Sequence, residues 1–242
     1  EGLDRKPDMV VIATPSSMHV EQAIAAARCG CHLFIEKPLC ANTDGLDELA
    51  EIVAERSLTT LVGCNMRFHP GPAKVKQLID GGAIGRLQYM RLHTGSYLPG
   101  WRPWQDYRKS YSANRSMGGG VLLDCIHEID LTRWYAGEFA SVYCDAGTIG
   151  SLEIDTEDYA AMVFRHTNGV RSETHLDYIS RTYERGCSVH GDEGTITWDF
   201  TAAQVRWYSA ETEEWTVFDL PSDYDTNTMY IDELHHFLAC ID

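Results

Sequence analysis

Short apolar runs and helical segments alternate over the first 66 residues of the chain. The strands are expected at residues 9–13, 32–35 and 60–63, and the helices from a cap at Ser16 or Ser17 to about Arg28 and from about Asp44 to Arg56. Continuous apolar runs of this length are typical of strands buried on both faces. The alternation predicts a parallel, doubly wound sheet over residues 1–66.

From residue 67 the pattern changes. A helix is expected from Pro70 to Gly81, a strand at 87–93, an aromatic and irregular stretch at 97–116, and a helix from Gly118–Gly120 to about Tyr135. Seven further strands are expected at 139–149, 157–166, 170–180, 186–190, 194–200, 204–208 and 214–220, before an amphipathic helix that begins near Asn227. Asn168-Gly169 is the strongest hairpin signal among them. Residues 67–242 are therefore predicted to form an α/β domain with an open, mostly antiparallel sheet that serves substrate binding and oligomerisation.

Composition limits the classes of function. The chain is 44% hydrophobic and 23% charged, with a net charge of −16. The composition is that of a globular protein, and the negative charge argues against nucleic acid as a partner. No apolar run approaches the ~20 residues of a membrane span. Eight scattered cysteines indicate reduced thiols in a cytoplasmic protein, and Cys29-Gly30-Cys31-His32 is interpreted as a helix end before a strand, with no metal site.

Asp124 and His127 are the first candidate chemical pair. On one continuous helix they would lie ~60° apart and face the same side. An acid/base pair in a cleft and a structural pair are equally consistent with this spacing. A carboxylate beside an imidazole would favour the charged imidazolium. Asp130 points elsewhere and is expected to be a structural hydrogen-bond acceptor.

Glu36-Lys37-Pro38 directly follows an apolar strand. Ligands bind at the carboxyl ends of strands in parallel sheets, and the proline keeps Lys37 extended. Taken alone, a solvated strand end is the favoured interpretation of this motif.

Four ordered motifs together resemble one family, the Gfo/Idh/MocA family of NAD(P)-dependent oxidoreductases. The motifs are Thr14-Pro15-Ser16-Ser17-Met18-His19, Glu36-Lys37-Pro38-Leu39, Asn65-Met66-Arg67-Phe68-His69-Pro70 and the segment Gly118–Asp130. The resemblance covers essentially the whole chain. It implies a Rossmann domain followed by an α/β domain with an open sheet, with NAD or NADP lying across their junction.

The resemblance also implies roles for individual residues. Lys37 matches the catalytic lysine, Asp124 the active-site acid and His127 the general acid/base. The positions that match the cofactor-lining residues are Thr14, Pro15, His19, Glu36, Lys37 and Asn65. The chain departs from the family pattern in two respects: Asp124 and His127 are three residues apart where many members have four, and no G-x-G-x-x-G turn is present. Roughly the first sixty or seventy residues of a full member and a C-terminal piece are expected to be missing, and this fragment alone is expected to be inactive.

The aromatic stretch at residues 97–116 suits a polyhydroxylated ligand. Aromatic rings cover the apolar faces of sugars, and arginine guanidinium groups bind hydroxyls or phosphates. Arg102, Tyr107 and Tyr111 are the candidate substrate residues. The expected activity is hydride transfer between nicotinamide and a hydroxyl of a sugar, cyclitol or nucleotide-sugar.

Three alternatives remain open: an NAD-dependent glycoside hydrolase of the same fold, a non-catalytic sugar- or NAD-binding regulator, and a metal site at Asp124, His127 and Glu128. A homodimer or homotetramer is expected through an exposed apolar face of the antiparallel sheet.

Overall fold

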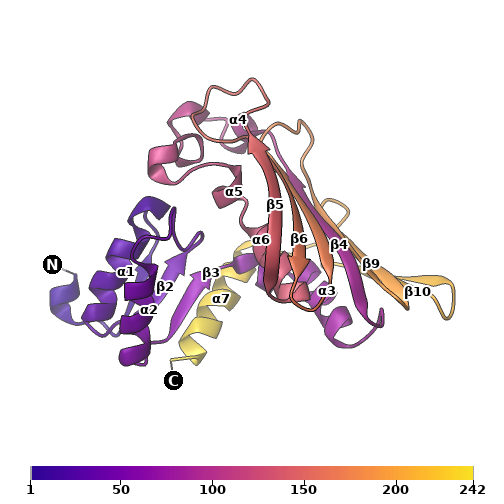
Figure 1. The fold of residues 1–242 in the computed structure, drawn as a ribbon, viewed down its shortest axis with the longest axis horizontal. Helices are drawn as coiled ribbons and strands as arrows, with labels where there is room; N and C mark the ends of the chain where they lie inside the picture. Colours follow the sequence, from indigo (N-terminus) through magenta and orange to yellow (C-terminus); the bar gives the residue numbers. More distant parts are fainter. Residues whose placement is uncertain (1, 242) are drawn as a thin grey trace.

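The structure is a computed structural model that describes residues 2–241. The first of its two sheets is parallel (Figure 1). Its strands are β1 (Met9–Ile12), β2 (His32–Glu36) and β3 (Thr60–Gly63), in the order β1-β2-β3. The connecting helices α1 (His19–Arg28) and α2 (Leu46–Glu55) contact one another. The apolar runs predicted the positions of these strands correctly, but the expected burial on both faces does not hold for β1, whose Val11 is 52% exposed.

The central strand β2 explains why its run is continuously apolar. Leu33 and Ile35 pack into the cluster that contains the alanines of α1 and Leu49 of α2. Phe34 contacts Phe237 of α7 (Asn227–Ala239) in an edge-to-face pair at 5.7 Å between ring centroids. Both faces of β2 are therefore covered, which removes any need for polar residues between its ends.

The second sheet has eight strands in the order β11-β10-β9-β8-β4-β7-β6-β5. Its strands are β4 (Leu87–Gly95), β5 (Phe139–Gly147), β6 (Tyr159–His166), β7 (Arg171–Asp177), β8 (Glu184–Gly191), β9 (Gly194–Asp199), β10 (Gln204–Ser209) and β11 (Glu214–Asp219). All neighbouring pairs are antiparallel except β4 and β7. Every predicted strand is found within a few residues, and Gly169, at φ +92°, makes the β6–β7 hairpin turn. The fold is the predicted partial Rossmann sheet followed by an open antiparallel sheet.

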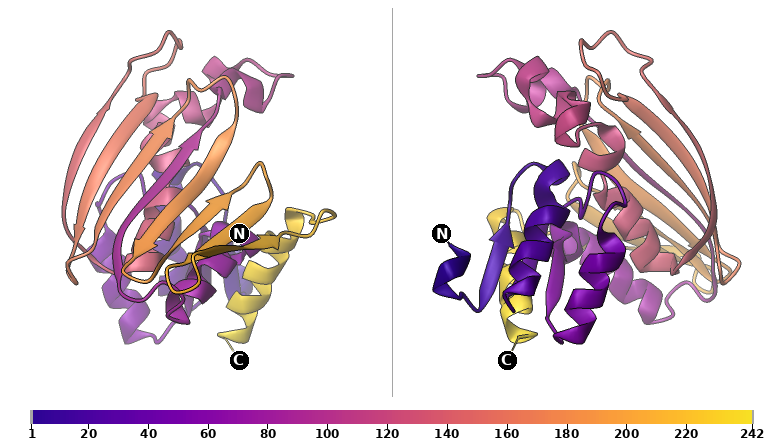
Figure 2. Two further views of the ribbon diagram at one scale, coloured as in Figure 1. Left: turned by 90° about the vertical axis from the view of Figure 1, so that its right-hand side faces the viewer. Right: turned by 60° about the vertical axis from the view of Figure 1, so that its left-hand side comes forward.

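One face of this second sheet is covered by helices. The helices of this unit are α3 (Pro70–Asp80), α4 (Leu98–Trp101), α5 (Val121–Asp124) and α6 (His127–Ala136). Leu131 and Tyr135 of α6 share a core with Met90 and Leu92 of β4 and with Val75 of α3. The other face is open to the viewer in the left panel of Figure 2.

The open face is less apolar than the sequence analysis expected. Tyr143, Val163, Trp215 and Val217 are exposed there or at its edges. Between them the sheet carries a hollow of about 760 Å³ whose walls also include charged and polar side chains: Arg91, His93, Glu173, His175, Glu184 and Ser188. The open face is therefore mixed polar and aromatic, and the expectation of an apolar face is corrected. The prediction of an antiparallel sheet holds, because such strands commonly have one face on the core and one face toward solvent.

Two local predictions were wrong. Neither Ser16 nor Ser17 caps α1, since these residues form a short 3₁₀ turn and α1 begins at His19. The hydroxyl of Ser16 instead donates across the junction between the two sheets, to the carbonyl oxygens of Met117 and Gly118 at 3.4 and 3.2 Å.

The helix predicted from Gly118–Gly120 to Tyr135 is two helices. Cys125, at φ −93° and ψ +31°, leaves helical geometry, and α6 starts afresh at His127. The expected ~60° relation between Asp124 and His127 therefore does not apply. The glycines before α5 serve a tight turn, because Gly120 has φ +111° and a side chain on Gly119 would lie 2.2 Å from the carbonyl oxygen of Tyr111.

Two further features bear on the class of protein. No helix within residues 2–241 combines the length and the apolar character needed to cross a bilayer. All eight cysteines are free thiols.

Candidate active site

Lys37 and Asp124 meet at the junction of the two sheets. Lys37 follows β2, and its Nζ donates to the carbonyl oxygen of Asp124 at 2.7 Å and to Oδ1 of the same residue at 3.1 Å. The lysine side chain is 19% exposed and the aspartate side chain 6%. A strand end and a helix separated by 87 residues in sequence thus form one partly buried ion pair.

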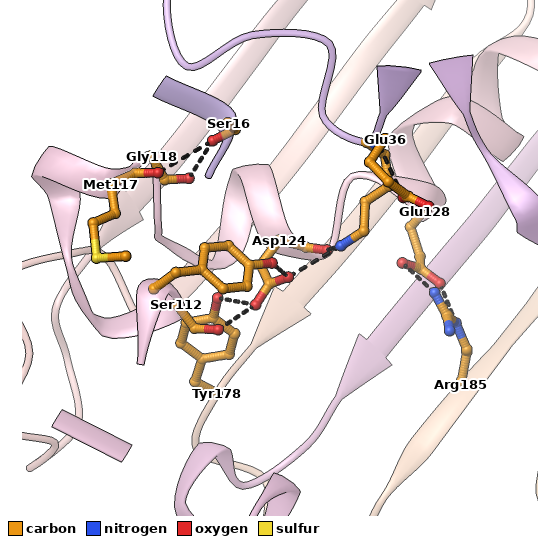
Figure 3. Close-up of polar contacts among 11 residues, drawn as sticks. Ser16, Glu36, Ser112, Met117, Gly118, Asp124, Glu128, Tyr178 and Arg185 are labelled. Atoms are coloured by element: carbon orange, nitrogen blue, oxygen red, sulfur yellow. Dashed lines mark hydrogen bonds and ion pairs between the residues drawn. The ribbon is translucent and has the colours of Figure 1, made fainter. Parts of the chain in front are cut away.

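Three hydroxyl groups complete the surroundings of Asp124 (Figure 3). Ser112 Oγ donates to Oδ2 at 2.7 Å, Tyr178 OH donates to the same oxygen at 3.2 Å, and Tyr111 OH donates to Oδ1. Burial alone would raise the pKa of Asp124, but the charge of Lys37 and these hydroxyl donors together lower it below the ordinary value. The carboxylate therefore stays ionised and holds the lysine.

His127 lies apart from this network. Its Nδ1 is buried and has no hydrogen-bond partner within residues 2–241. Burial, Arg185 and Lys37 lower the pKa of His127 well below its ordinary value. The expectation that Asp124 favours an imidazolium at His127 is therefore wrong, because Asp124 is paired with Lys37 and two cations act on the ring.

Glu128 is engaged in an ion pair of its own. Arg185 of β8 donates from Nε to Oε1 at 2.6 Å and from a terminal nitrogen to Oε2 at 3.1 Å. The weaker hypothesis of a metal site at Asp124, His127 and Glu128 gains no support, because the two carboxylates are paired with the side chains of Lys37 and Arg185. Residues 2–241 contain no group of three or more His, Cys, Asp or Glu side chains placed to hold a metal ion.

Asp130 has the structural role expected of it. Arg67, which follows β3, donates to its two carboxylate oxygens at 2.8 and 2.5 Å. This pair ties α6 to the end of the parallel sheet.

A cavity of about 420 Å³ opens beside Lys37 and Asp124. Its walls come from the ends of β1 and β2, from the aromatic stretch, from α5 and from α7. The residues that line it are Ala13, Thr14, Pro15, Ser16, Glu36, Lys37, Pro38, Trp101, Arg102, Tyr111, Ser112, Asp124 and Tyr230. The structure thus brings seven of the predicted residues to one cavity: four predicted cofactor residues, one of which is the predicted catalytic lysine Lys37, two predicted substrate residues, and Asp124.

Four predicted residues do not line this cavity. His19 bridges two of its loops, with its ring nitrogens each 2.8 Å from a carbonyl oxygen, one of Thr14 and one of Pro38. Asn65 is buried, and its Oδ1 has no hydrogen-bond partner among the described residues, 2–241. The hydroxyl of Tyr107 accepts from the backbone nitrogen of Glu153 at 3.2 Å, which is a structural contact. His127 is the fourth.

Sequence reasoning missed several residues of the site. Ser112 and Trp101 adjoin predicted residues and could have been inferred from their neighbours. Tyr178 and Tyr230 carry no motif, since one follows β7 and the other lies on α7, and only the fold brings them to Asp124 or to the cavity.

The comparisons with known proteins agree with the two-part fold. The profile described as "Oxidoreductase family, NAD-binding Rossmann fold" matches residues 2–64, and the profile of the GFO/IDH/MocA C-terminal domain matches residues 73–197. The scyllo-inositol 2-dehydrogenase (NAD(+)) of Bacillus subtilis is 30% identical over 246 residues, which cover 97% of this chain and 67% of that protein. The 2,7-anhydro-N-acetylneuraminate hydratase of Escherichia coli is 32% identical over 226 residues, which cover 90% of this chain and 59% of that protein.

A solved structure of levoglucosan dehydrogenase in complex with NADH and levoglucosan superposes with a TM-score of 0.85 at 25% identity, over 99% of this chain and 72% of that one. The chain spans little more than half the length of several curated relatives. With both profiles matched in order and together spanning most of the sequence, the chain belongs to the GFO/IDH/MocA oxidoreductase family.

Proposed function

We propose that the whole protein transfers a hydride between nicotinamide and a hydroxyl-bearing carbon of a sugar, cyclitol or nucleotide-sugar. The single observation that carries this proposal is the Lys37–Asp124 pair at the wall of a cavity built from both sheets. A cation held at the carboxyl end of a parallel strand is suited to stabilise an alkoxide as it forms.

In this proposal Lys37 hydrogen-bonds the reacting hydroxyl and stabilises its negative charge. Asp124 holds the lysine in place through this ion pair, and the hydroxyl donors of Asp124 keep its carboxylate ionised. For His127 we keep the general acid/base role that the family resemblance implies, with the ring buried behind the cavity wall in the neutral form that can accept a proton.

NAD or NADP is the cofactor we propose. The fit rests on the cavity walls: Thr14 and Pro15 follow β1, Glu36 and Lys37 end β2 or follow it, and both strand ends open into the same space. Strand ends and loop atoms at the carboxyl edge of a parallel sheet are the usual binding place of a dinucleotide. When bound, the nicotinamide accepts or donates the hydride.

For the substrate we propose contacts with Arg102 and Tyr111. Both line the cavity, where a guanidinium and a phenol offer several donors to hydroxyl groups, and Trp101 offers an apolar ring face. Tyr107 is not among the proposed substrate contacts, because its hydroxyl accepts a hydrogen bond from the backbone of Glu153.

The decisive experiment couples substrate screening to two variants. Sugars and cyclitols are incubated with the protein and NAD or NADP, and formation of reduced nicotinamide is followed by absorbance. Lys37→Met and His127→Ala should each lower kcat by roughly 10²–10⁴-fold, the usual contribution of general acid/base or electrostatic catalysis.

Cofactor Kd should change little in His127→Ala, because this residue lies outside the cavity wall that we assign to the dinucleotide. The matched control is Lys76→Met, which removes a lysine from the surface ion pair with Asp80. Near-normal turnover in His127→Ala would show that its role is structural.

A second candidate function is elimination or hydration that begins with a transient oxidation, as in an NAD-dependent glycoside hydrolase. The related E. coli hydratase favours keeping this alternative. Net formation of reduced cofactor supports a dehydrogenase, whereas a changed sugar with no net reduction supports the alternative. A non-catalytic regulator would bind ligand and show neither.

We also propose that the protein is a cytoplasmic homodimer or homotetramer associated through the open face of the antiparallel sheet. That face is free of covering helices and carries exposed aromatic and aliphatic side chains, including Tyr143 and Val163 (Figure 2).

A further inference from the structure

We propose that Arg185 is a positioning residue for His127, which it holds in place through Glu128. The inference rests on the proposed function in one respect, namely that His127 exchanges a proton with the substrate hydroxyl.

The first support is the geometry of the pair. Glu128 is the residue after His127, in the first turn of α6, and its side chain is 1% exposed. Arg185, in β8, is 14% exposed and binds both carboxylate oxygens (Figure 3). Two parallel N–H···O bonds fix the direction of a carboxylate as well as its distance, which a single bond does not do.

The second support is the break in the helix. Because the chain leaves helical geometry at Cys125, the start of α6 is not continued from α5. The Glu128–Arg185 pair attaches this free start to the antiparallel sheet, and the Arg67–Asp130 pair attaches the next residues to the parallel sheet. His127 lies directly before Glu128 and is therefore placed by the same attachment.

The third support is electrostatic. The charged groups that act on His127 are Arg185 from β8 and Lys37 from the segment after β2, while the nearby carboxylates Asp124 and Glu128 are each occupied by one of these cations. Burial is the largest cause of the lowered pKa of His127, and the two cations add to it. Only a neutral imidazole can accept a proton from a hydroxyl group.

The test uses the double variant Glu128→Gln/Arg185→Met, which removes both charges with little change in volume. Arg185→Met alone would leave a buried carboxylate without a partner and could prevent folding. Arg185→Lys retains the charge and loses the two-pronged contact. The matched control is Arg133→Met/Glu138→Gln, which removes an exposed Arg–Glu pair from the other end of the same helix.

The first readout is independent of activity. The ring of His127 is followed by NMR against pH, with its signals assigned from the His127→Gln spectrum. In the parent protein and the control the ring should titrate well below the ordinary pH range of a histidine. In the double variant its titration midpoint should rise toward that range, because the charge of Arg185 is gone, and in Arg185→Lys it should stay low.

The second readout is the pH dependence of kcat/KM with the substrate found by screening. We expect kcat in the double variant to fall at least roughly ten-fold, with the acidic limb of the profile displaced to higher pH. An unchanged His127 titration in the double variant overturns the proposal. Lost activity with an unmoved titration also overturns it, since a purely structural role predicts that result. If no substrate is turned over, the proposed function fails. The NMR titration of His127 then still shows whether Arg185 affects the protonation of the ring.

Discussion

At the scale of single residues, the site is organised around Asp124. Four donors converge on this one residue, from Lys37, Tyr111, Ser112 and Tyr178, and they come from three separate segments of the chain. Charge-assisted hydrogen bonds are stronger than neutral ones, and in a buried position each is costly to lose. The arrangement explains how a carboxylate that is 7% exposed remains ionised beside the cavity.

Tyr178→Phe tests this arrangement. The hydroxyl of Tyr178 is removed without a change of packing, and the free energy of unfolding should fall by about 1.5–3 kcal/mol, the usual value of a hydrogen bond to a charged group. Denaturant unfolding measures the change. Tyr143→Phe, at an exposed tyrosine of β5, is the control and should be neutral. Equal stability of the two variants would mean that Tyr178 contributes nothing to Asp124.

At the scale of elements, α7 shows how a helix far along the chain completes the parallel sheet. Its Phe237 is fully buried against Phe34 of β2, and its Tyr230 reaches the wall of the cavity. The same helix carries Glu233, which is 1% exposed and has no hydrogen-bond partner for either carboxylate oxygen within residues 2–241. Burial, followed by the charges of Glu36 and Asp130, raises the pKa of Glu233 to about 8.

The raised pKa predicts a dependence of stability on pH. The folded pKa lies above the unfolded value, so the contribution of Glu233 is fully present below about pH 4.5 and is lost as the pH rises through about 8. Glu233→Gln should therefore be more stable than the parent at about pH 8–9, by about 1–3 kcal/mol, and should approach it at about pH 4.5.

Denaturant unfolding across this range measures the difference between the two proteins. Asp232→Asn, the preceding and exposed residue of α7, is the matched control and should show no such trend. A difference that is constant with pH would contradict a buried, protonated Glu233.

At the scale of the whole molecule, two sheets built on different principles share one cavity. The parallel sheet contributes strand ends, and the antiparallel sheet and its helices contribute Asp124, its hydroxyl partners and the aromatic stretch. Ser16 and the Lys37–Asp124 pair hold the two units together at this junction. The helix-free face of the antiparallel sheet lies on the side away from the parallel sheet (Figures 1 and 2).

The proposed association through that face predicts an oligomer in solution. Light scattering should give a dimer or tetramer for the parent protein. Val163→Asp places a charge among the exposed side chains of β6 and should shift the population toward monomer, because burying an unpaired charge is costly. Val163→Thr keeps the shape of the side chain without a charge and should shift it much less. A parent that is monomeric at every concentration would exclude this assembly.

The order and type of the elements could be predicted from the sequence, because they depend on local patterns. Continuous apolar runs at 9–13, 32–35 and 60–63 predicted parallel strands, and the turn signals between successive strand segments after residue 139 predicted the antiparallel strands. Lys37 at a strand end and Asp124 near a glycine turn could be singled out for the same reason, with the family motifs adding the expectation that they meet.

The partners within the site were decided only by the tertiary structure. Helical periodicity placed Asp124 beside His127, but the break at Cys125 separates them, and Lys37 and Tyr178 become the partners of Asp124. The polar residues on the open sheet face, the buried Glu233 and the Glu128–Arg185 pair likewise carry no local signal. Hydrophobic patterning depends on neighbours a few positions away. Hydrogen-bond partners and desolvation depend on contacts between residues far apart in the sequence, such as Lys37 and Asp124, which are 87 positions apart, and these contacts exist only once the chain has folded.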